Sequence, residues 1–238
     1  MSDIHDTVRD YYRQAAEAGH DACVPPDDVR WGVGRYEEGS LDDVPDGATG
    51  LSMGCGNPYA LADLREGEVV LDLGSGGGID VILSAKRVGP TGRAFGVDFL
   101  PEMLELAETN AAEAGVDNVE FLAGTIEGVP LPDDSVDVVI SNCVINLAPD
   151  KTPVFAEMAR VLRRGGRVAV SDVVTDEDAP PADPTDGQAW AECGAGGLSV
   201  DAYGEMLRAA GFVDVRIERT HVVGDGLHAA TVWARTRL

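Results

Sequence analysis

The sequence predicts an α/β protein with a doubly wound, mostly parallel sheet and with extensions on both its N-terminal and C-terminal sides. Two observations carry this prediction. Between residues 67 and 174, short runs of aliphatic and β-branched residues alternate with segments of helical spacing. The predicted strands are nearly all apolar, which is typical of strands that helices cover on both faces of a parallel sheet.

The elements of this middle region follow one another closely. A first apolar strand runs directly into a cluster of glycines, and helical spacing begins right after it. The same alternation then continues to the end of the region. We predict strands at 68–75, 94–99, 119–124, 136–141 and 167–172, and helices at 79–88, 101–114 and 154–162.

The two flanks are less regular. Residues 1–60 contain a predicted helix at 7–18 and then a Gly-, Asp- and Pro-rich stretch, and irregular stretches of this length are typical of lids and binding loops. An acidic, Pro-rich linker follows the middle region. We expect three parts: an N-terminal thiol-bearing region (1–60), a cofactor-binding domain (61–174) and a sheet-completing region (175–238) with a helix near 200–211 and strands at 213–219 and 228–236.

The charge balance narrows the choice of partners. The 42 acidic residues outnumber the 18 basic ones, which gives a formal net charge of −24. Nucleic acids and anionic membrane surfaces both need a basic footprint, so we expect neither as a partner. Acid excess spread over a whole chain is typical of proteins that work in concentrated salt, where their self-repulsion is screened. The alternative is an ordinary acidic protein.

The cellular location of the protein is predicted from two further sequence patterns. No apolar stretch approaches the ~18 residues that a membrane-spanning helix needs. The first residues, MSDIHDTVRDYYRQ, do not show the basic-then-apolar pattern of a secretory leader. We therefore expect a cytoplasmic protein, and a monomer.

A glycine-rich loop follows the first predicted strand. Such a loop lets the backbone approach a nucleotide, and Asp98, at the end of the second strand, is placed to accept hydrogen bonds from ribose hydroxyls. A dinucleotide fingerprint would place a glycine where Ile79 stands. Asp72 would repel a pyrophosphate but would favour a cofactor with sulfonium and ammonium groups. The loop residues that we expect to bind this cofactor are Asp72, Gly74, Gly76 and Gly78.

The stretch VVLDLGSGGGIDVILSA, with FGVDFLPEMLELA behind it, resembles the class I S-adenosylmethionine-dependent methyltransferases, which have a Rossmann-like fold. The resemblance implies that the glycine loop lies along the methionine part of the cofactor and that Asp98 holds the ribose. It also implies that the adenine site includes Phe99, Met103, Thr125, Ile126 and Glu127. Asp98 could instead cap a helix, and Met103 could be core packing. Asn142, after the fourth strand, is either a pocket donor or a turn residue.

Four cysteines, at 23, 55, 143 and 193, stand far apart, and no C-x-x-C pair indicates a zinc site. They are either unrelated core residues or brought together by the fold. Cys143 directly follows the fourth strand, at the edge of the sheet where ligands of such folds bind. Several thiols near a methyl donor suit a soft acceptor such as trivalent arsenic, which keeps a lone pair when two or three thiolates hold it.

Four short motifs sharpen this hypothesis. GCGNP, SNCVINLAPDK, WAECGAG and TVRDYY together resemble the arsenite S-adenosylmethionine methyltransferases. The resemblance implies that Cys143 and Cys193 hold arsenic, with Cys55 as a candidate third ligand. It further implies that Cys23 and Cys55 assist the first methylation and form a disulfide that thioredoxin or a small thiol reduces.

Two alternatives stay open from the sequence. The chain could be a methyltransferase for a small carbon or oxygen acceptor, with incidental cysteines. It could also be a non-catalytic metalloid-binding protein, which would keep the thiols but would not need the loop at residues 74–78.

Overall fold

The fold is described from a computed structural model of the 238-residue chain. The structure describes residues 4–18, 31–37, 39–50, 52–179, 183, 186–191 and 195–238. Two of the predicted thiol residues, Cys23 and Cys193, lie outside the described residues. Cys55 and Cys143 lie within them, and both are buried.

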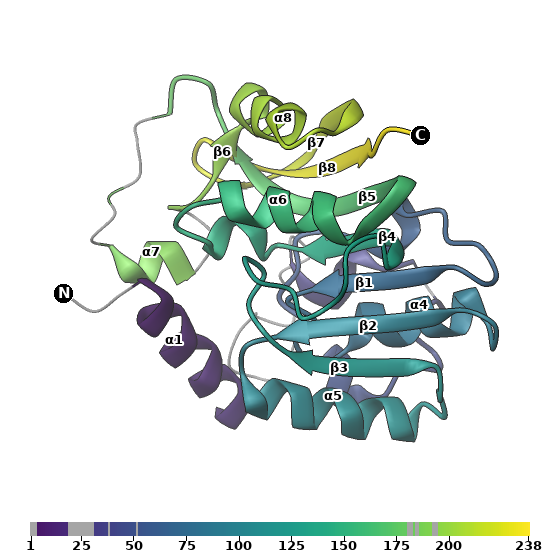
Figure 1. Ribbon diagram of the computed structural model, residues 1–238. Helices are drawn as coiled ribbons and strands as arrows, with labels where there is room; N and C mark the ends of the chain where they lie inside the picture. The colour runs from purple at the N-terminus through teal and green to yellow at the C-terminus, as the bar shows by residue number, and fades with distance from the viewer. Residues whose placement is uncertain are drawn as a thin grey trace.

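One mixed sheet organises the described part of the chain, with strands in the order β3-β2-β1-β4-β5-β8-β7 (Figure 1). Strands β1 to β5 are parallel, as the apolar runs predict, whereas β8 and β7 add to β5 as an antiparallel hairpin. The short β6 pairs with the end of β5. The strands are β1 (Val69–Leu73), β2 (Arg93–Asp98), β3 (Val119–Ala123), β4 (Val136–Asn142), β5 (Leu162–Thr175), β6 (Leu198–Ser199), β7 (Val213–Gly224) and β8 (Leu227–Arg235).

All the helices predicted by apolar spacing are present. They are α1 (Ile4–Ala18), α4 (Ile79–Val88), α5 (Pro101–Glu113), α6 (Thr152–Val161) and α8 (Val200–Ala209). Five short helical elements among the described residues were not predicted, because helices of three to five residues show no apolar period. These additional elements are η1 (Gly32–Arg35), α2 (Asp46–Thr49), α3 (Pro58–Leu61), η2 (Ile145–Leu147) and α7 (Gly187–Ala191). None of the helices among the described residues is long and apolar enough to cross a membrane.

The sheet is covered on both faces, which explains its nearly continuous apolar strands. On one face, Leu71 of β1 and Val139 of β4 belong to the same buried cluster as Phe155 of α6 and Tyr203 of α8. On the other face, Val70, next to Leu71, packs with residues of α4 and of the segment around α3. This doubly wound arrangement is the fold class that the sequence predicts.

The carboxyl ends of the parallel strands all open on one side of the molecule. Figure 1 shows the arrowheads of β2 and β3 pointing toward α1, which lies beside α7. Because β1 pairs with β2 on one side and with β4 on the other, the strand order switches direction around β1. Ligands of open α/β sheets bind at such a switch point. We therefore expect a ligand-binding site at the carboxyl ends of β1, β2 and β4.

Candidate active site

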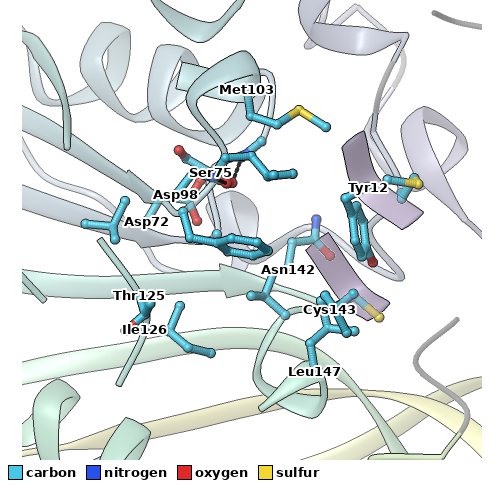
Figure 2. A pocket seen from close by; sticks show the side chains of 18 of the residues that line it. Tyr12, Asp72, Ser75, Asp98, Met103, Thr125, Ile126, Asn142, Cys143 and Leu147 are labelled. Atoms are coloured by element: carbon cyan, nitrogen blue, oxygen red, sulfur yellow. Dashed lines mark hydrogen bonds between the residues drawn. The ribbon is translucent and has the colours of Figure 1, made fainter. Parts of the chain in front are cut away.

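A cavity of about 580 Å³ lies at the carboxyl ends of β1, β2 and β4 (Figure 2). Helix α1 and the segment after β4 complete its wall. The fold thus brings together, around one cavity, residues that stand as far apart in the sequence as Val8 and Pro153. The sequence-predicted residues that line it are Asp72, Gly74, Gly76, Asp98, Phe99, Met103, Thr125, Ile126, Glu127, Asn142 and Cys143.

Three of the four glycines of the loop, Gly74, Gly76 and Gly78, have positive φ angles but different surroundings. Gly74, at φ +73°, lies close to Val144. A Cβ on Gly74 would lie 2.5 Å from the Cγ1 of Val144. Gly76, at φ +49°, has no atom within 4 Å of the Cβ position. Gly78 precedes α4 at φ +88°, and its Cβ position lies 3.1 Å from Phe121. Gly78 is not among the residues that line the cavity; its position serves the turn into α4 and the packing of that helix.

The contrast between Gly74 and Gly76 makes a testable pair. We expect Gly74→Ala to lower the free energy of unfolding by about 3 kcal/mol, because backbone strain and a clash with Val144 add together. Gly76→Ala should cost only about 1 kcal/mol, from strain alone. Urea unfolding in the same salt measures both. Adding Val144→Ala to Gly74→Ala should recover part of the loss, and equal losses for the two single variants would contradict this reading of the loop.

Asp98 links the two first strands of the site. It is 8% exposed, and its Oδ2 accepts a hydrogen bond from the Gly76 amide while its Oδ1 accepts one from the Leu100 amide, both at 3.0 Å. Burial raises the pKa of Asp98, and these backbone hydrogen bonds oppose that shift. Helix α5 has Leu100, not Asp98, at its N-cap position, so the carboxylate belongs to the cavity wall.

Two further buried carboxylates line the cavity near the glycine loop. Burial raises the pKa of Asp72 well above its usual range, and the charges of Asp80 and Asp98 raise it further. Burial likewise raises the pKa of Asp80 to about 6, against hydrogen bonds from Tyr36 and Asn142. Three buried acids around one cavity favour a bound cation, because each is costly to ionise without one.

Asp80 belongs to a hydrogen-bonded network that the sequence did not predict. The Tyr36 hydroxyl donates to Asp80 Oδ2 at 2.9 Å, and Asn142 Nδ2 approaches the same oxygen at 3.4 Å. Asn142 also exchanges hydrogen bonds with the backbone of Gly56, at 3.0 Å and 3.3 Å. Asn142 therefore ties the end of β4 to the segment that carries Cys55. Tyr36 stands in the irregular stretch, where no periodic pattern points to a role.

Cys143 has an unusual backbone conformation at the end of β4. Its φ of +63° lies in the left-handed region, which is uncommon for a residue with a Cβ, and its amide donates to Ser171 O at 2.8 Å. Its side chain is 3% exposed and lines the cavity. Strained backbone of this kind clusters at functional sites, where the surrounding structure maintains it. The left-handed conformation turns the chain out of the sheet at Cys143, the residue that we predict to hold the acceptor.

Cys55 lies behind the cavity wall. It is 1% exposed and does not line the cavity of Cys143, although both cysteines belong to one apolar cluster. Trp190 and Ala191 of α7 and Leu147 of η2 also belong to this cluster. The structure thus brings two of the four predicted thiol residues into one cluster.

Helix α1 covers the cavity and joins it to α7. Val8, Arg9 and Tyr12 line the cavity, and the Arg9 guanidinium lies 5.7 Å from the centre of the Phe99 ring. The Tyr12 hydroxyl donates to the carbonyl of Ala191 at 3.3 Å. Figure 2 shows Tyr12 on the same side of the cavity as Cys143. The sequence predicts this helix, but only the structure places it over the site.

A family model described as "Methyltransferase domain" matches residues 64–211, which cover the glycine loop, the strands from β1 to β6 and helices α4 to α8. The chain belongs to the methyltransferase domain family. Its sheet order and glycine loop are those of the class I methyltransferase fold, so the predicted fold class is confirmed.

This methyltransferase is similar to several curated arsenite methyltransferases. It is 43% identical over 242 residues to the one of Halobacterium salinarum, with 94% of this chain and 62% of the relative covered. The human arsenite methyltransferase is 31% identical, with 93% and 61% covered. The chain thus spans about three fifths of the length of these relatives. A crystal structure of an arsenic(III) S-adenosylmethionine methyltransferase from Chlamydomonas reinhardtii superposes with a TM-score of 0.73 at 36% identity, covering 84% of this chain and 72% of that one.

The site residues of this methyltransferase fit S-adenosylmethionine. The donor carries a sulfonium, an ammonium and a ribose diol, and it supplies an electrophilic methyl group. Asp72 and Asp80 offer carboxylates for its cationic part, and Asp98 offers acceptors beside the glycine loop for its hydroxyls. The open side of Gly76 leaves room for close approach of a ligand to the backbone.

The raised pKa of Asp80 predicts that the affinity for this donor depends on pH. The raised pKa of Asp80, about 6, means that its carboxyl is neutral below that pH and charged above it. We therefore expect the dissociation constant for S-adenosylmethionine to rise by up to about tenfold per pH unit as the pH falls below about 6. Calorimetry in one salt across this range measures it. S-adenosylhomocysteine, without the sulfonium charge, should weaken less, and Asp80→Asn should flatten the profile; identical profiles for both ligands would contradict the assignment.

Proposed function

We propose that this protein transfers the methyl group of S-adenosylmethionine to trivalent arsenic that its own thiolates hold, a detoxification of arsenite. One observation carries the proposal: the strained, buried Cys143 lines the same cavity as Asp98 and the glycine loop. A thiolate is a soft ligand and suits a soft acceptor such as arsenic. The similarity to curated arsenite methyltransferases supports the same substrate.

The described residues supply several of the parts that this reaction would require. Cys143 would hold the arsenic atom with its lone pair toward the methyl group, and its thiol proton would leave on binding, so that no separate base is needed. Phe99, Val144 and Leu147 supply apolar walls on the same cavity, which would limit the access of water to a bound acceptor. Orientation of acceptor and donor then accounts for most of the acceleration.

The second arsenic ligand in this proposal is Cys193. The residues two positions before and after it, Ala191 and Ala195, pack in the same apolar cluster as Cys143. In addition, a Cβ on Gly196 would lie 1.8 Å from the carbonyl oxygen of Asn146, so the chain just after Cys193 touches the turn after Cys143. Both observations support a pair of thiolates at one site.

Cys55 and Cys23 complete the proposed chemistry. Cys55 is a candidate third ligand and, with Cys23, the pair that would be oxidised to a disulfide when a pentavalent product is reduced to the trivalent state. Tyr12 and Trp31, described residues on either side of Cys23 in the sequence, pack in the cluster that contains Cys55. This placement supports the pairing. Thioredoxin or a small thiol would then restore the thiols.

The setting of the protein is part of the proposal. We propose a monomer in the cytoplasm of an organism with concentrated intracellular salt. The net charge of −24 supports the saline setting, and a relative from Halobacterium salinarum agrees with it. Assays therefore belong in molar KCl, where such a surface is screened.

The test is speciation of the products formed from arsenite, S-adenosylmethionine and a thiol in molar KCl. Methylated arsenicals, separated by chromatography and detected by arsenic-specific mass spectrometry, are the expected result. Methyl transfer to a small carbon or oxygen acceptor, with arsenite left unchanged, would overturn the proposal. Arsenite binding without any binding of S-adenosylmethionine would favour a non-catalytic metalloid-binding protein instead.

A further inference from the structure

Two side chains from outside η2 hold this turn, which follows β4. Its residue Leu147 and the next residue, Ala148, both line the cavity of the candidate active site. Lys151 Nζ donates to the Asn146 carbonyl at 3.3 Å and to the Ala148 carbonyl at 2.8 Å. Trp190 Nε1 donates to the Leu147 carbonyl, between them, at 3.0 Å, and Lys151 Nζ lies 5.4 Å from the centre of the Trp190 ring. The ammonium and the indole therefore contact each other and share three successive carbonyls of the turn.

Local structure does not explain a lysine at position 151. Lys151 is the N-cap residue of α6, where the helix dipole disfavours a positive charge and where short polar residues are preferred. The Thr152 amide in the first turn of α6 donates instead to Asp150 Oδ1, at 2.8 Å. Only two of the 18 basic residues in the chain are lysines, Lys86 and Lys151. A residue that opposes the local preference of its own helix indicates a role in another part of the structure.

The ammonium of Lys151 is buried, and its surroundings compensate its charge. Lys151 is 5% exposed, and a buried ammonium is costly unless carbonyls or an opposite charge face it. Asp172 of β5 interacts with it: burial raises the pKa of this carboxyl to about 7, and the Val173 amide and the positive charge of Lys151 oppose that shift. The fold thus keeps a charged group beside the turn despite the cost of burying it.

The same turn meets the described chain on both sides of Cys193. Trp190 belongs to α7, which ends two residues before Cys193. On the other side, a Cβ on Gly196 would lie 1.8 Å from the Asn146 carbonyl oxygen, which also accepts the hydrogen bond from Lys151. Lys151 therefore holds a carbonyl that faces Gly196 and contacts the ring of Trp190, so it acts on both flanks of Cys193.

We propose that Lys151 is a positioning residue for the acceptor: it holds the turn after Cys143 against α7 and so sets the spacing of the two thiolates that bind arsenic. The inference rests on the proposed function for Cys143 and Cys193 as the ligands. Lys151 does not line the cavity, so it acts through the turn and not by contact with the donor. Two thiolates must lie at a fixed separation to hold one arsenic atom, whereas binding to a single thiolate does not depend on that separation.

Two small arsenicals separate the spacing of the thiolates from the general stability of the protein. Methylarsonous acid has two exchangeable hydroxyls, so it forms two As–S bonds with two thiols and releases two waters. Dimethylarsinous acid has one exchangeable hydroxyl, so it forms one As–S bond and releases one water. In a Cys23→Ala and Cys55→Ala background, Cys143 and Cys193 are the thiols that remain. Competition with a small dithiol in oxygen-free molar KCl, measured by mass spectrometry of the intact protein, gives both affinities.

The variant Lys151→Met removes the ammonium and keeps most of the length of the side chain. We expect its affinity for methylarsonous acid to fall at least about tenfold, because two buried carbonyls lose their donor and the turn is no longer held against α7. Its affinities for dimethylarsinous acid and S-adenosylhomocysteine should change less than about threefold. Lys86→Met is the matched control. Lys86 is exposed and also donates to a carbonyl, that of Asp43 at 2.6 Å, and its replacement should change none of the three affinities.

Equal losses for the two arsenicals in Lys151→Met, or no loss for either, would overturn the inference. If Lys151→Met does not fold, as a loss of S-adenosylhomocysteine binding would show, Trp190→Phe replaces it in the test. This variant removes the indole donor from the Leu147 carbonyl and keeps an aromatic ring, so the same selective loss is expected, and an unselective one would equally overturn the inference. A selective loss in a protein that does not methylate arsenite would disprove the proposed function and leave the role of Lys151 standing.

Discussion

Replacing Cys143 with serine is expected, under the proposed function, to lower the rate of arsenite methylation at least about a hundredfold, since the arsenic would lose a thiolate ligand in the cavity that the donor is proposed to occupy. The dissociation constant for S-adenosylhomocysteine should change less than about threefold, because the glycine loop, Asp72 and Asp98 remain. Product speciation measures the first quantity and calorimetry the second. Retained methylation in Cys143→Ser would end the arsenic hypothesis for this residue.

The positive φ of Cys143 provides a matched control for this experiment. Asparagine tolerates the left-handed conformation better than other residues with a Cβ, so Cys143→Asn preserves the turn at the end of β4 while it removes the thiol. If the thiol matters, Cys143→Asn and Cys143→Ser lose activity alike. If only the backbone turn matters, Cys143→Asn stays active and the role of a ligand is wrong.

The second large effect is expected at Asp98. Asp98→Ala should raise the dissociation constant for S-adenosylhomocysteine about a hundredfold, or by about 2.7 kcal/mol, if the carboxylate holds the ribose as we expect, because its hydrogen bonds to the ribose and to the loop would be lost together. The same carboxylate holds the amides of Gly76 and Leu100, so its removal also loosens the loop. Calorimetry in molar KCl gives the constant directly.

A matched acid controls for the general effect of charge. Glu102 lies in the first turn of α5, its side chain is 43% exposed, and it does not line the cavity. Glu102→Gln removes the same charge and should leave the dissociation constant within about twofold. Asp98→Asn, which keeps the size of the side chain, should fall between the two because its Oδ1 still accepts one amide hydrogen bond. Equal affinities for Asp98→Ala and the unmodified protein would show that the ribose lies elsewhere.

The parallel strands and the long helices could be predicted because their signal is local. Val69–Leu73 and Val136–Asn142 are apolar along their length, and α5 and α8 repeat their apolar residues with the period of a helix. The glycine loop and Asp98, at the end of β2, could also be predicted, because a nucleotide-binding turn requires those residue types in that order. For these elements, neighbouring residues alone carry the information.

Other parts of the site could not be predicted from the sequence, because they depend on contacts between distant segments. Tyr36 reaches Asp80 across 44 residues, and its hydrogen bond exists only because the irregular stretch folds back over α4. The confinement of Cys55 to a cavity separate from that of Cys143 likewise depends on how β5 and the β7–β8 hairpin pack against α3. Such contacts join segments with no shared periodicity, so no local pattern encodes them.

The sequence by itself therefore determined the class I methyltransferase fold, the glycine loop and the candidate role of Cys143. The tertiary structure decided which buried acids surround the cavity, that α1 covers it, and that Cys143 leaves β4 at φ +63°. The physical reason is the range of the interactions: backbone propensity and apolar periodicity act over a few neighbouring residues, whereas burial, pKa shifts and strained turns arise only when distant segments pack together.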